Sequence, residues 1–304
     1  MFKMKYRFLK YLCELNRLNQ NFPARWRLCR WLDQQKTVLR ASPAGPAKIA
    51  NRTYIYLNPL ESFDGLKTLI YGLNIREPLT NIISQLLRPG DNMIDVGANV
   101  GYFSALASLT VGLNGKIFSF EASPSTYQRL QVLANNNLYR NIKTYNHAVS
   151  DANSEIEFHC GPTNHTGISS IRSLGNKTSS VVKVSAIRLD NMIDDFPPIR
   201  LIKIDVEGAE TLVLNGMKSL LARDKPYVIA EISDSFLRQL GSNKHELING
   251  FCELGYSAYR VNVAIKPYMH ADELQCDVLF VPSGMAVPNF SHKLHRSNWA
   301  NIDR

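Results

Sequence analysis

The chain has 304 residues, of which 45% are hydrophobic and 20% charged, with 17 Gly and 14 Pro. This composition is typical of a globular protein and excludes a collagen-like, low-complexity or wholly disordered chain. The formal net charge is +9, from 35 Lys and Arg against 26 Asp and Glu.

Almost all of the positive charge lies near the N-terminus, since residues 1 to 40 hold ten Lys or Arg and two acids. The apolar residues of this segment fall on one face of a predicted helix: Phe2, Tyr6, Leu9, Leu12, Cys13 and Leu15. A basic amphipathic helix of this kind either lies on an anionic membrane or covers the following domain together with Trp26 and Trp31. The sequence leaves both interpretations open for residues 1–35.

Five scattered Cys without a CxxC pair predict neither a disulfide framework nor a zinc ribbon. The N-terminus shows no secretion signal, so we expect a cytoplasmic protein, with peripheral contact to the inner membrane face as the alternative. The longest uncharged run, Val96 to Gly115, holds four glycines and several polar residues. It therefore predicts a glycine turn and a helix rather than a membrane span.

Three regions are expected along the chain. Residues 1–48 form a basic helical arm that ends in a linker of Ala, Ser, Pro and Gly at 41–48. Residues 49–284 form one α/β domain, and residues 285–304 form a polar tail.

The α/β domain alternates short β-rich runs with helical ones, which predicts a mostly parallel sheet with helices on both faces. The expected strands are Asn92–Val96, Lys116–Glu121, Ile142–His147, Leu201–Val206, Tyr227–Ile232, Tyr256–Val261 and Asp277–Val281. Two further alternating runs, Glu155–His159 and Val181–Ile187, predict a hairpin inserted into this pattern.

The first expected strand runs into a glycine-rich turn that ends at Gly101 and is followed by a helix over Tyr102–Leu109. Glycines let a ligand approach the backbone, and the start of a helix offers free N–H groups. The G-x-x-x-G spacing differs from that of dinucleotide and phosphate loops. Glu121 ends the next strand, where a carboxylate can bind ribose hydroxyls, and Asp95 adds a second acid. Two acids favour S-adenosylmethionine over a pyrophosphate ligand.

With these residues the chain resembles the FkbM-type family of S-adenosylmethionine-dependent methyltransferases. The resemblance is carried by Arg88 to Ser104, Phe120 to Pro124, His147 to Asp151, Leu189 and Asp190, and above all by Ile202 to Glu210. It implies a class I methyltransferase fold (Rossmann-like) with a seven-stranded, mostly parallel sheet whose last strand is antiparallel. It also implies methyl transfer to a hydroxyl, often on a sugar or a polyketide.

The resemblance also implies roles for individual residues toward the cofactor. The turn that faces the methionine part comprises Asp95, Gly97, Asn99 and Gly101. Glu121 becomes the ribose-binding acid, with Ser123 and Ala148 beside the adenine. Glu77 matches an acid upstream of the first strand, although it follows Ile-Arg where an aromatic residue is more usual.

A hydroxyl acceptor needs a general base or a metal that lowers its pKa. We expect Asp205 and Glu207, which follow the fourth strand, to serve on the acceptor side, with Glu231 after the fifth strand next. Glu210 opens a predicted helix over Ala209–Leu221, where acids commonly only complement the helix dipole. A divalent ion could also bind Asp205, Glu207 and Glu231, because hard cations prefer carboxylate oxygens. The sequence does not fix the geometry of such a site, so no metal is assigned.

His165 lies in the predicted insert and could assist as a neutral base, or it is a solvated loop residue. The favoured function is O-methylation of a hydroxyl on a sugar, glycan or small natural product. The alternatives are a noncatalytic S-adenosylmethionine-binding scaffold and a nucleic-acid methyltransferase, which the basic arm would suit. The region after the fourth strand lacks the Asn/Asp-Pro-Pro-aromatic run of base-modifying enzymes, so no nucleic-acid partner is expected.

Overall fold

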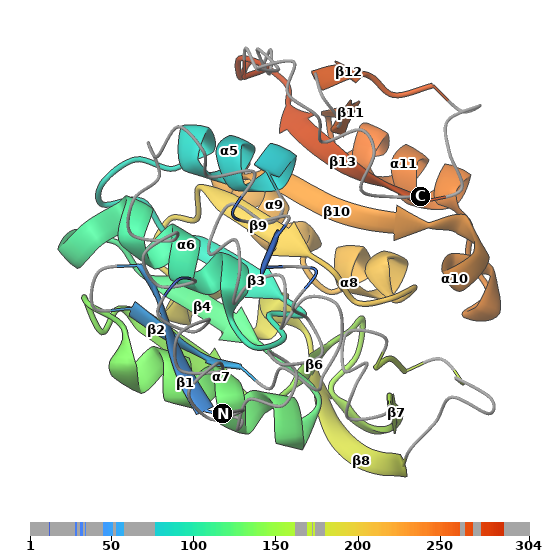
Figure 1. Ribbon diagram of the computed structural model, residues 1–304. Helices are drawn as coiled ribbons and strands as arrows, with labels where there is room; N and C mark the ends of the chain where they lie inside the picture. The colour runs from blue at the N-terminus through green and yellow to red at the C-terminus, as the bar shows by residue number, and fades with distance from the viewer. Residues whose placement is uncertain are drawn as a thin grey trace.

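The computed structural model (Figure 1) describes most of the α/β domain and part of what precedes it. The described residues are 12, 28, 31, 32, 34, 45–50, 53–57, 77–161, 169–171, 173, 180–261, 265–269 and 275–288, with only the backbone at 45–50, 53–57 and 77.

The centre of the described domain is one eight-stranded sheet in the order β12-β11-β13-β10-β9-β3-β4-β5. The strands are β3 (Met93–Val96), β4 (Ile117–Phe120), β5 (Ile142–Tyr145), β9 (Leu201–Ile204), β10 (Tyr227–Ser233), β11 (Tyr256–Val261), β12 (Ile265–Pro267) and β13 (Gln275–Pro282). Strands β5, β4, β3, β9 and β10 pair in parallel, and β13 runs antiparallel to both β10 and β11. The predicted mostly parallel sheet with an antiparallel last strand is confirmed.

The eighth strand was not expected. β12 is three residues long, contains Pro267 and pairs only with β11 at the outer edge. A short strand with a proline gives no alternating pattern that sequence reasoning could detect.

Helices cover both faces of the sheet. On one face, α5 (Glu77–Leu86), α6 (Tyr102–Val111) and α7 (Pro124–Asn136) pack with side chains such as Met93 and Leu201. On the other, α8 (Glu210–Asn215), α9 (Lys218–Asp224), α10 (Asp234–Gln239) and α11 (Lys244–Glu253) pack with Ile94 and Ile202. The short 3₁₀ helices η2 (Gly112–Asn114) and η5 (Leu189–Asp195) complete the layers. Because side chains alternate along a strand, each strand supplies both cores.

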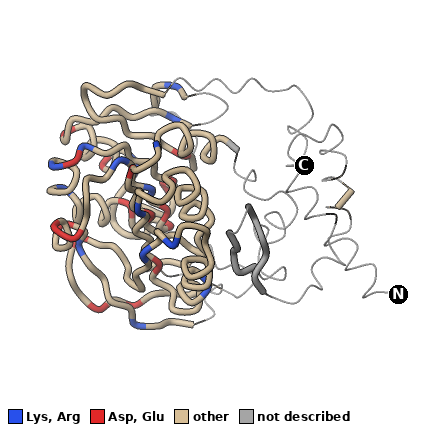
Figure 2. Tube along the Cα trace, turned by 90° about the vertical axis from the view of Figure 1, so that its left-hand side faces the viewer, with Lys and Arg blue, Asp and Glu red and all other residues tan. Residues whose placement is uncertain are grey.

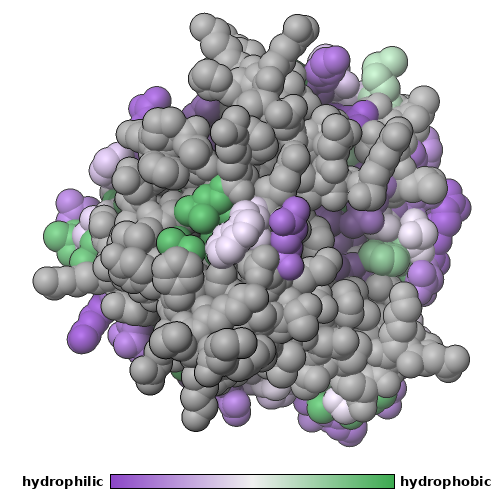
Figure 3. All heavy atoms as spheres, viewed as in Figure 1, coloured by the Kyte–Doolittle hydropathy of each residue, from purple (hydrophilic) through white to green (hydrophobic). Residues whose placement is uncertain are grey.

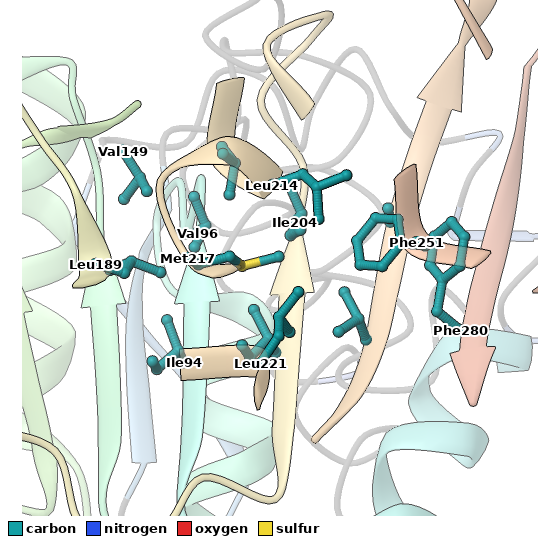
Figure 4. Close-up of a cluster of buried hydrophobic side chains, with 14 of the residues drawn as sticks. Ile94, Val96, Val149, Leu189, Ile204, Leu214, Met217, Leu221, Phe251 and Phe280 are labelled. Carbon is teal, nitrogen blue, oxygen red and sulfur yellow. The ribbon is translucent and has the colours of Figure 1, made fainter. Parts of the chain in front are cut away.

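The core on the second face is shown in Figure 4, where Val96, Ile204 and Met217 converge between the strands and helices. The rings of Phe251 (α11) and Phe280 (β13) stack with centroids 3.8 Å apart. Each fully buried side chain of this size contributes about 1.5–3 kcal/mol, so the central strands are held firmly in register.

The inserted hairpin is confirmed as an antiparallel pair, β7 (Ser154–Cys160) with β8 (Ser180–Ile187). The short strand β6 (Ala148–Val149) pairs in parallel with β8 and makes a second, three-stranded sheet. The hairpin therefore joins the domain directly after β5, next to the predicted adenine-side residue Ala148.

The single helix predicted over Ala209–Leu221 is wrong, because α8 and α9 are separate and break at Gly216. A Cβ at Gly216 would overlap the carbonyl oxygen of Ser150, and the Gly216 carbonyl accepts the N–H of Asp190. Asp190 then accepts the Leu220 N–H through Oδ1, which caps the first turn of α9. Contacts with η5 and with the segment after β6 thus divide the helix.

Parts of the segment before the domain lie against it. Leu32 is fully buried in the core that contains α5 and α6, and Leu12 and Leu28 pack against that core. These contacts favour the domain-covering interpretation of the arm at its described positions.

β1 (Gly45–Ala50) pairs antiparallel with β2 (Thr53–Leu57), which lies against α7. Residues 45–48 are therefore a strand and not the predicted linker.

The exposed large apolar side chains are distributed over several elements: Trp31, Leu113, Val181, Leu254, Met269 and Val287. Hydrophilic residues predominate among the described residues visible in Figure 3. Over the described residues, no helix combines the length and apolar character needed to cross a bilayer.

Candidate active site

The turn between β3 and α6 has a left-handed backbone at Gly97 (φ 75°), Asn99 (φ 50°) and Gly101 (φ 90°). A Cβ at Gly97 would overlap the carbonyl oxygen of Asp205, and one at Gly101 would lie 2.7 Å from the side chain of Leu133. From the sequence, these glycines are expected to make room for a ligand, but this is only part of their role. They also make room for the Asp205 backbone and the Leu133 side chain, so the turn contacts the backbone of the loop after β9.

Glu121 follows β4, and its carboxylate binds this turn by a hydrogen bond on the side away from the loop after β9. Its Oε2 accepts the N–H of Asn99 and its Oε1 accepts the N–H of Ser123, each at 2.9 Å. The side chain is buried, and this burial raises the pKa of the Glu121 carboxyl to about 7. Each carboxylate oxygen keeps a further lone pair that can accept a hydrogen bond from a ligand hydroxyl.

Two of the other residues expected at the cofactor, Ser123 and Ala148, lie in segments that contact the region of residues 121–123. Ser123 is buried at the start of α7, and Ala148 is buried in β6. Asn146 connects the two regions, since its Nδ2 donates to the carbonyl oxygens of Glu121 and Ala122. Glu77 is the first residue of α5, and its side chain lies outside the described residues.

Asp95 belongs to a polar cluster buried beneath α6. Its Oδ2 accepts the Ser104 hydroxyl at 2.5 Å, and Ser104 also shares a hydrogen bond with Ser119 at 2.8 Å. Lys203 Nζ lies 3.9 Å from Asp95 Oδ1. Burial raises the pKa of the Asp95 carboxyl, and Lys203 partly offsets this. Sequence reasoning gave no role to Lys203, although a lysine inside an apolar strand was a signal that an acid lay nearby.

The loop after β9 carries the acids expected on the acceptor side. The Asp205 N–H donates to the Val96 carbonyl, and its carboxylate accepts from Lys203 Nζ at 3.1 Å while 22% of the side chain stays exposed. Glu207 has a left-handed backbone (φ 55°), and its carbonyl accepts the Ser170 hydroxyl of the insert at 3.0 Å. The inserted hairpin is thus tied to the loop that holds Asp205.

Glu210 opens α8 and turns back to this loop. Its Oε1 accepts the Gly208 N–H at 3.0 Å, and the side chain is buried. Burial raises the pKa of the Glu210 carboxyl to about 7, and the nearby Asp205 raises it further. Glu210 is therefore a buried group that shapes the loop rather than a surface acid at a helix end.

We expect Glu210→Gln to reduce a pH dependence of stability. The pKa of Glu210 rises from 4.5 to about 7 on folding. The protonated carboxyl therefore stabilises the fold fully below about pH 4.5, and this contribution is lost as the pH rises through about 7. A shift of this size corresponds to roughly 3 kcal/mol. Thermal unfolding should show the variant gaining stability over wild type at about pH 8 but not below about pH 4.5.

Glu253, an exposed acid at the end of α11, supplies the control. Glu253→Gln should not reproduce the gain in stability over wild type at about pH 8. A Glu210→Gln variant with the same stability difference at both pH values would show that Glu210 does not titrate as described. Glu121 retains its own pH dependence in both variants.

Glu231 lies within β10, which extends to Ser233, so its expected place after that strand is wrong. Its Oε1 accepts a hydrogen bond from Gln275 Nε2 at 2.8 Å. In the antiparallel register of β10 and β13, Glu231 lies opposite Asp277. Since Ala230 pairs with Ile204, Glu231 and Asp205 follow neighbouring positions of adjacent strands.

His165 lies outside the described residues. Within the described part of the chain, no group of three or more His, Cys, Asp and Glu side chains is arranged to hold a metal ion.

The arrangement brings four carboxylates together at the carboxyl ends of β3, β4 and β9. Asp205 interacts electrostatically with Asp95, Glu121 and Glu210, which come from three other segments.

The parallel sheet, its antiparallel strand β13 and the glycine turn between β3 and α6 define a class I methyltransferase. A family model for the methyltransferase FkbM domain matches residues 95–258. The chain belongs to this FkbM family of S-adenosylmethionine-dependent methyltransferases.

Individual relatives are distant. The hexuronic acid methyltransferase AglP of Haloferax volcanii is 27% identical over 144 residues, which are 47% of this chain and 56% of that protein. This chain thus spans little more than half the length of that curated relative. The solved FkbM methyltransferase of Methylobacillus flagellatus is 16% identical with a TM-score of 0.41, covering 71% of this chain and 54% of that one. An S-adenosylmethionine-dependent O-methyltransferase of Thermotoga maritima is 12% identical with a TM-score of 0.38, over 69% and 67% of the two chains.

Proposed function

We propose that this protein transfers a methyl group from S-adenosylmethionine to a hydroxyl of a sugar, a glycan or a small natural product. The observation that carries the proposal is the position of Asp205. Its partly exposed carboxylate follows β9, and its backbone touches the glycine turn at Gly97. A proton acceptor placed beside the cofactor turn is what a hydroxyl nucleophile requires.

The residues around the turn fit the cofactor. Asp95 Oδ1 and Asn99 Oδ1 are buried acceptors without a hydrogen-bond partner among the described residues. Surplus carboxylates suit a ligand with a sulfonium and an ammonium group. In the proposal Glu121 binds the ribose hydroxyls, the turn with Asp95, Gly97, Asn99 and Gly101 faces the methionine part, and Ser123 and Ala148 adjoin the adenine, with Glu77 upstream. S-adenosylmethionine supplies a methyl group that is activated by its positive sulfur.

The chain's own residues then have two tasks. They align the acceptor oxygen at about 3 Å from the methyl carbon in the line of displacement, and they remove the hydroxyl proton. We assign proton removal to Asp205. Glu207, whose carbonyl is tied to Ser170, and Glu231, which is held by Gln275, are proposed to orient the acceptor. His165 is retained as an acceptor-side candidate.

The class of acceptor rests on two supports. The relative AglP is a hexuronic acid methyltransferase, which favours a sugar acceptor. Figure 2 shows Lys and Arg positions mixed with Asp and Glu positions over the described trace, whereas a nucleic-acid-binding face usually gathers positive charge. We also propose a cytoplasmic location, which is supported by the scattered cysteines of the sequence, since no two of them form a CxxC pair.

The test of this function is methyl transfer from labelled S-adenosylmethionine to a panel of hexuronic acids, neutral hexoses, polyketide alcohols and oligonucleotides. We expect label in a sugar or alcohol and release of S-adenosylhomocysteine in equal amount. Label in oligonucleotides alone would replace the proposal by the nucleic-acid alternative. Tight binding of S-adenosylmethionine by calorimetry without transfer to any acceptor would favour the noncatalytic scaffold.

A further inference from the structure

Lys203 occupies a position where a lysine is unusual. It lies within β9, at the centre of the eight-stranded sheet, and is only 4% exposed. Its neighbours in the strand, Ile202 and Ile204, are fully buried. An ammonium group in such a place is costly unless partners of opposite charge surround it. The contacts of Lys203 therefore indicate why it is there.

The ammonium of Lys203 lies between two aspartates from adjacent strands. It donates to Asp205 Oδ2 at 3.1 Å and lies 3.9 Å from Asp95 Oδ1. Asp95 is its direct cross-strand neighbour in the β3–β9 register. The ring of Phe103 in α6 lies 4.8 Å from Nζ and adds a cation–π contact. Three elements therefore fix one ammonium group.

The two aspartates belong to different halves of the proposed site. Asp95 lies beneath the glycine turn that is proposed to bind the cofactor. Asp205 is the proposed base that removes the acceptor proton. Two further acids interact electrostatically with Asp205, Glu121 after β4 and Glu210 from α8. Glu207 lies two residues further along the same loop, and Glu231 lies in the adjacent strand β10. Within this described set, Lys203 supplies the positive charge.

We propose that Lys203 is a positioning residue that holds the Asp95 and Asp205 carboxylates in place and sets the net negative charge that the sulfonium of S-adenosylmethionine meets. This inference rests on the proposed function, since it takes Asp95 and Asp205 as the cofactor-side and acceptor-side acids. With Lys203 present, one of the two aspartate charges is balanced. The other aspartate charge stays available to attract the positive sulfur of the cofactor.

The test uses the charge difference between two ligands. S-adenosylmethionine carries a positive sulfur, whereas the sulfur of S-adenosylhomocysteine is neutral. Calorimetry gives the Kd of each ligand for wild type, Lys203→Met and Lys203→Arg. Loss of the positive charge should shift the affinity ratio about tenfold toward S-adenosylmethionine in Lys203→Met, by Coulomb attraction in a buried site. Lys203→Arg should keep the wild-type ratio within about threefold.

A purely structural role predicts a different result, because a loosened site would weaken both ligands equally in Lys203→Met. An unchanged ratio with intact wild-type binding would overturn the role of Lys203 alone. A wild type that binds neither ligand would overturn the proposed function as well. If Lys203→Met does not fold, the Asp95→Asn/Lys203→Met double variant is compared with Asp95→Asn, and the same tenfold shift is expected.

Discussion

Asp205→Asn is expected to lower kcat by about 10²- to 10⁴-fold, the usual contribution of a general base. The substitution keeps the shape of the side chain and leaves an oxygen that can accept the 3.1 Å hydrogen bond from Lys203. The loop after β9 should therefore retain its position, so the loss falls on proton removal. The measurement is kcat for methyl transfer to the acceptor found in the panel, together with the Kd of S-adenosylhomocysteine.

The S-adenosylhomocysteine affinity should stay within about threefold of wild type, since that ligand carries no charge at sulfur. Asp195→Asn is the matched control, because Asp195 is an exposed acid in η5 and should leave kcat unchanged. If Asp205→Asn retained wild-type kcat, proton removal would belong to another group. Glu207 and Glu231 would then be tested in the same way.

Glu121→Ala should weaken the binding of S-adenosylmethionine by about 10²- to 10⁴-fold. Two hydrogen bonds from ribose hydroxyls to a carboxylate are lost, each worth about 1.5–3 kcal/mol. The N–H groups of Asn99 and Ser123 also lose their acceptors, which loosens the turn. Glu121→Gln keeps one oxygen acceptor and should lie between wild type and Glu121→Ala. Calorimetric titration with S-adenosylmethionine and with S-adenosylhomocysteine measures the change in Kd.

The pH dependence of binding supplies a second readout for Glu121. Because the pKa of its carboxyl is raised to about 7, the ionised form that best accepts the ribose hydroxyls becomes dominant only above that pH. Wild-type affinity should therefore rise between about pH 6 and pH 8, and this rise should be smaller in Glu121→Ala. The exposed Glu155→Ala serves as control. Equal affinities in Glu121→Ala and wild type would mean that the ribose binds elsewhere.

Much of the fold could be predicted because its signals are local. The central strands are short apolar runs that are buried on both faces, as Met93–Val96 and Leu201–Ile204 show. The glycine turn was found because left-handed backbone at Gly97 and Gly101 favours glycine. Glu121 was found because it follows the next strand. The division of the helix at Gly216 was missed, since its cause is a contact with Ser150 and Asp190, far away in sequence.

The sequence by itself determined the parallel sheet, the glycine turn and the family, because these depend on residue types at fixed local spacing. Only the tertiary structure decided that Lys203 joins Asp95 to Asp205 and that Gly97 makes room for the Asp205 carbonyl. It also decided that the insert reaches the site through Ser170. Apart from the Lys203–Asp205 pair, which is two residues apart, these contacts link positions 37 to more than a hundred residues apart. Their geometry follows from strand order and register, which no local pattern encodes.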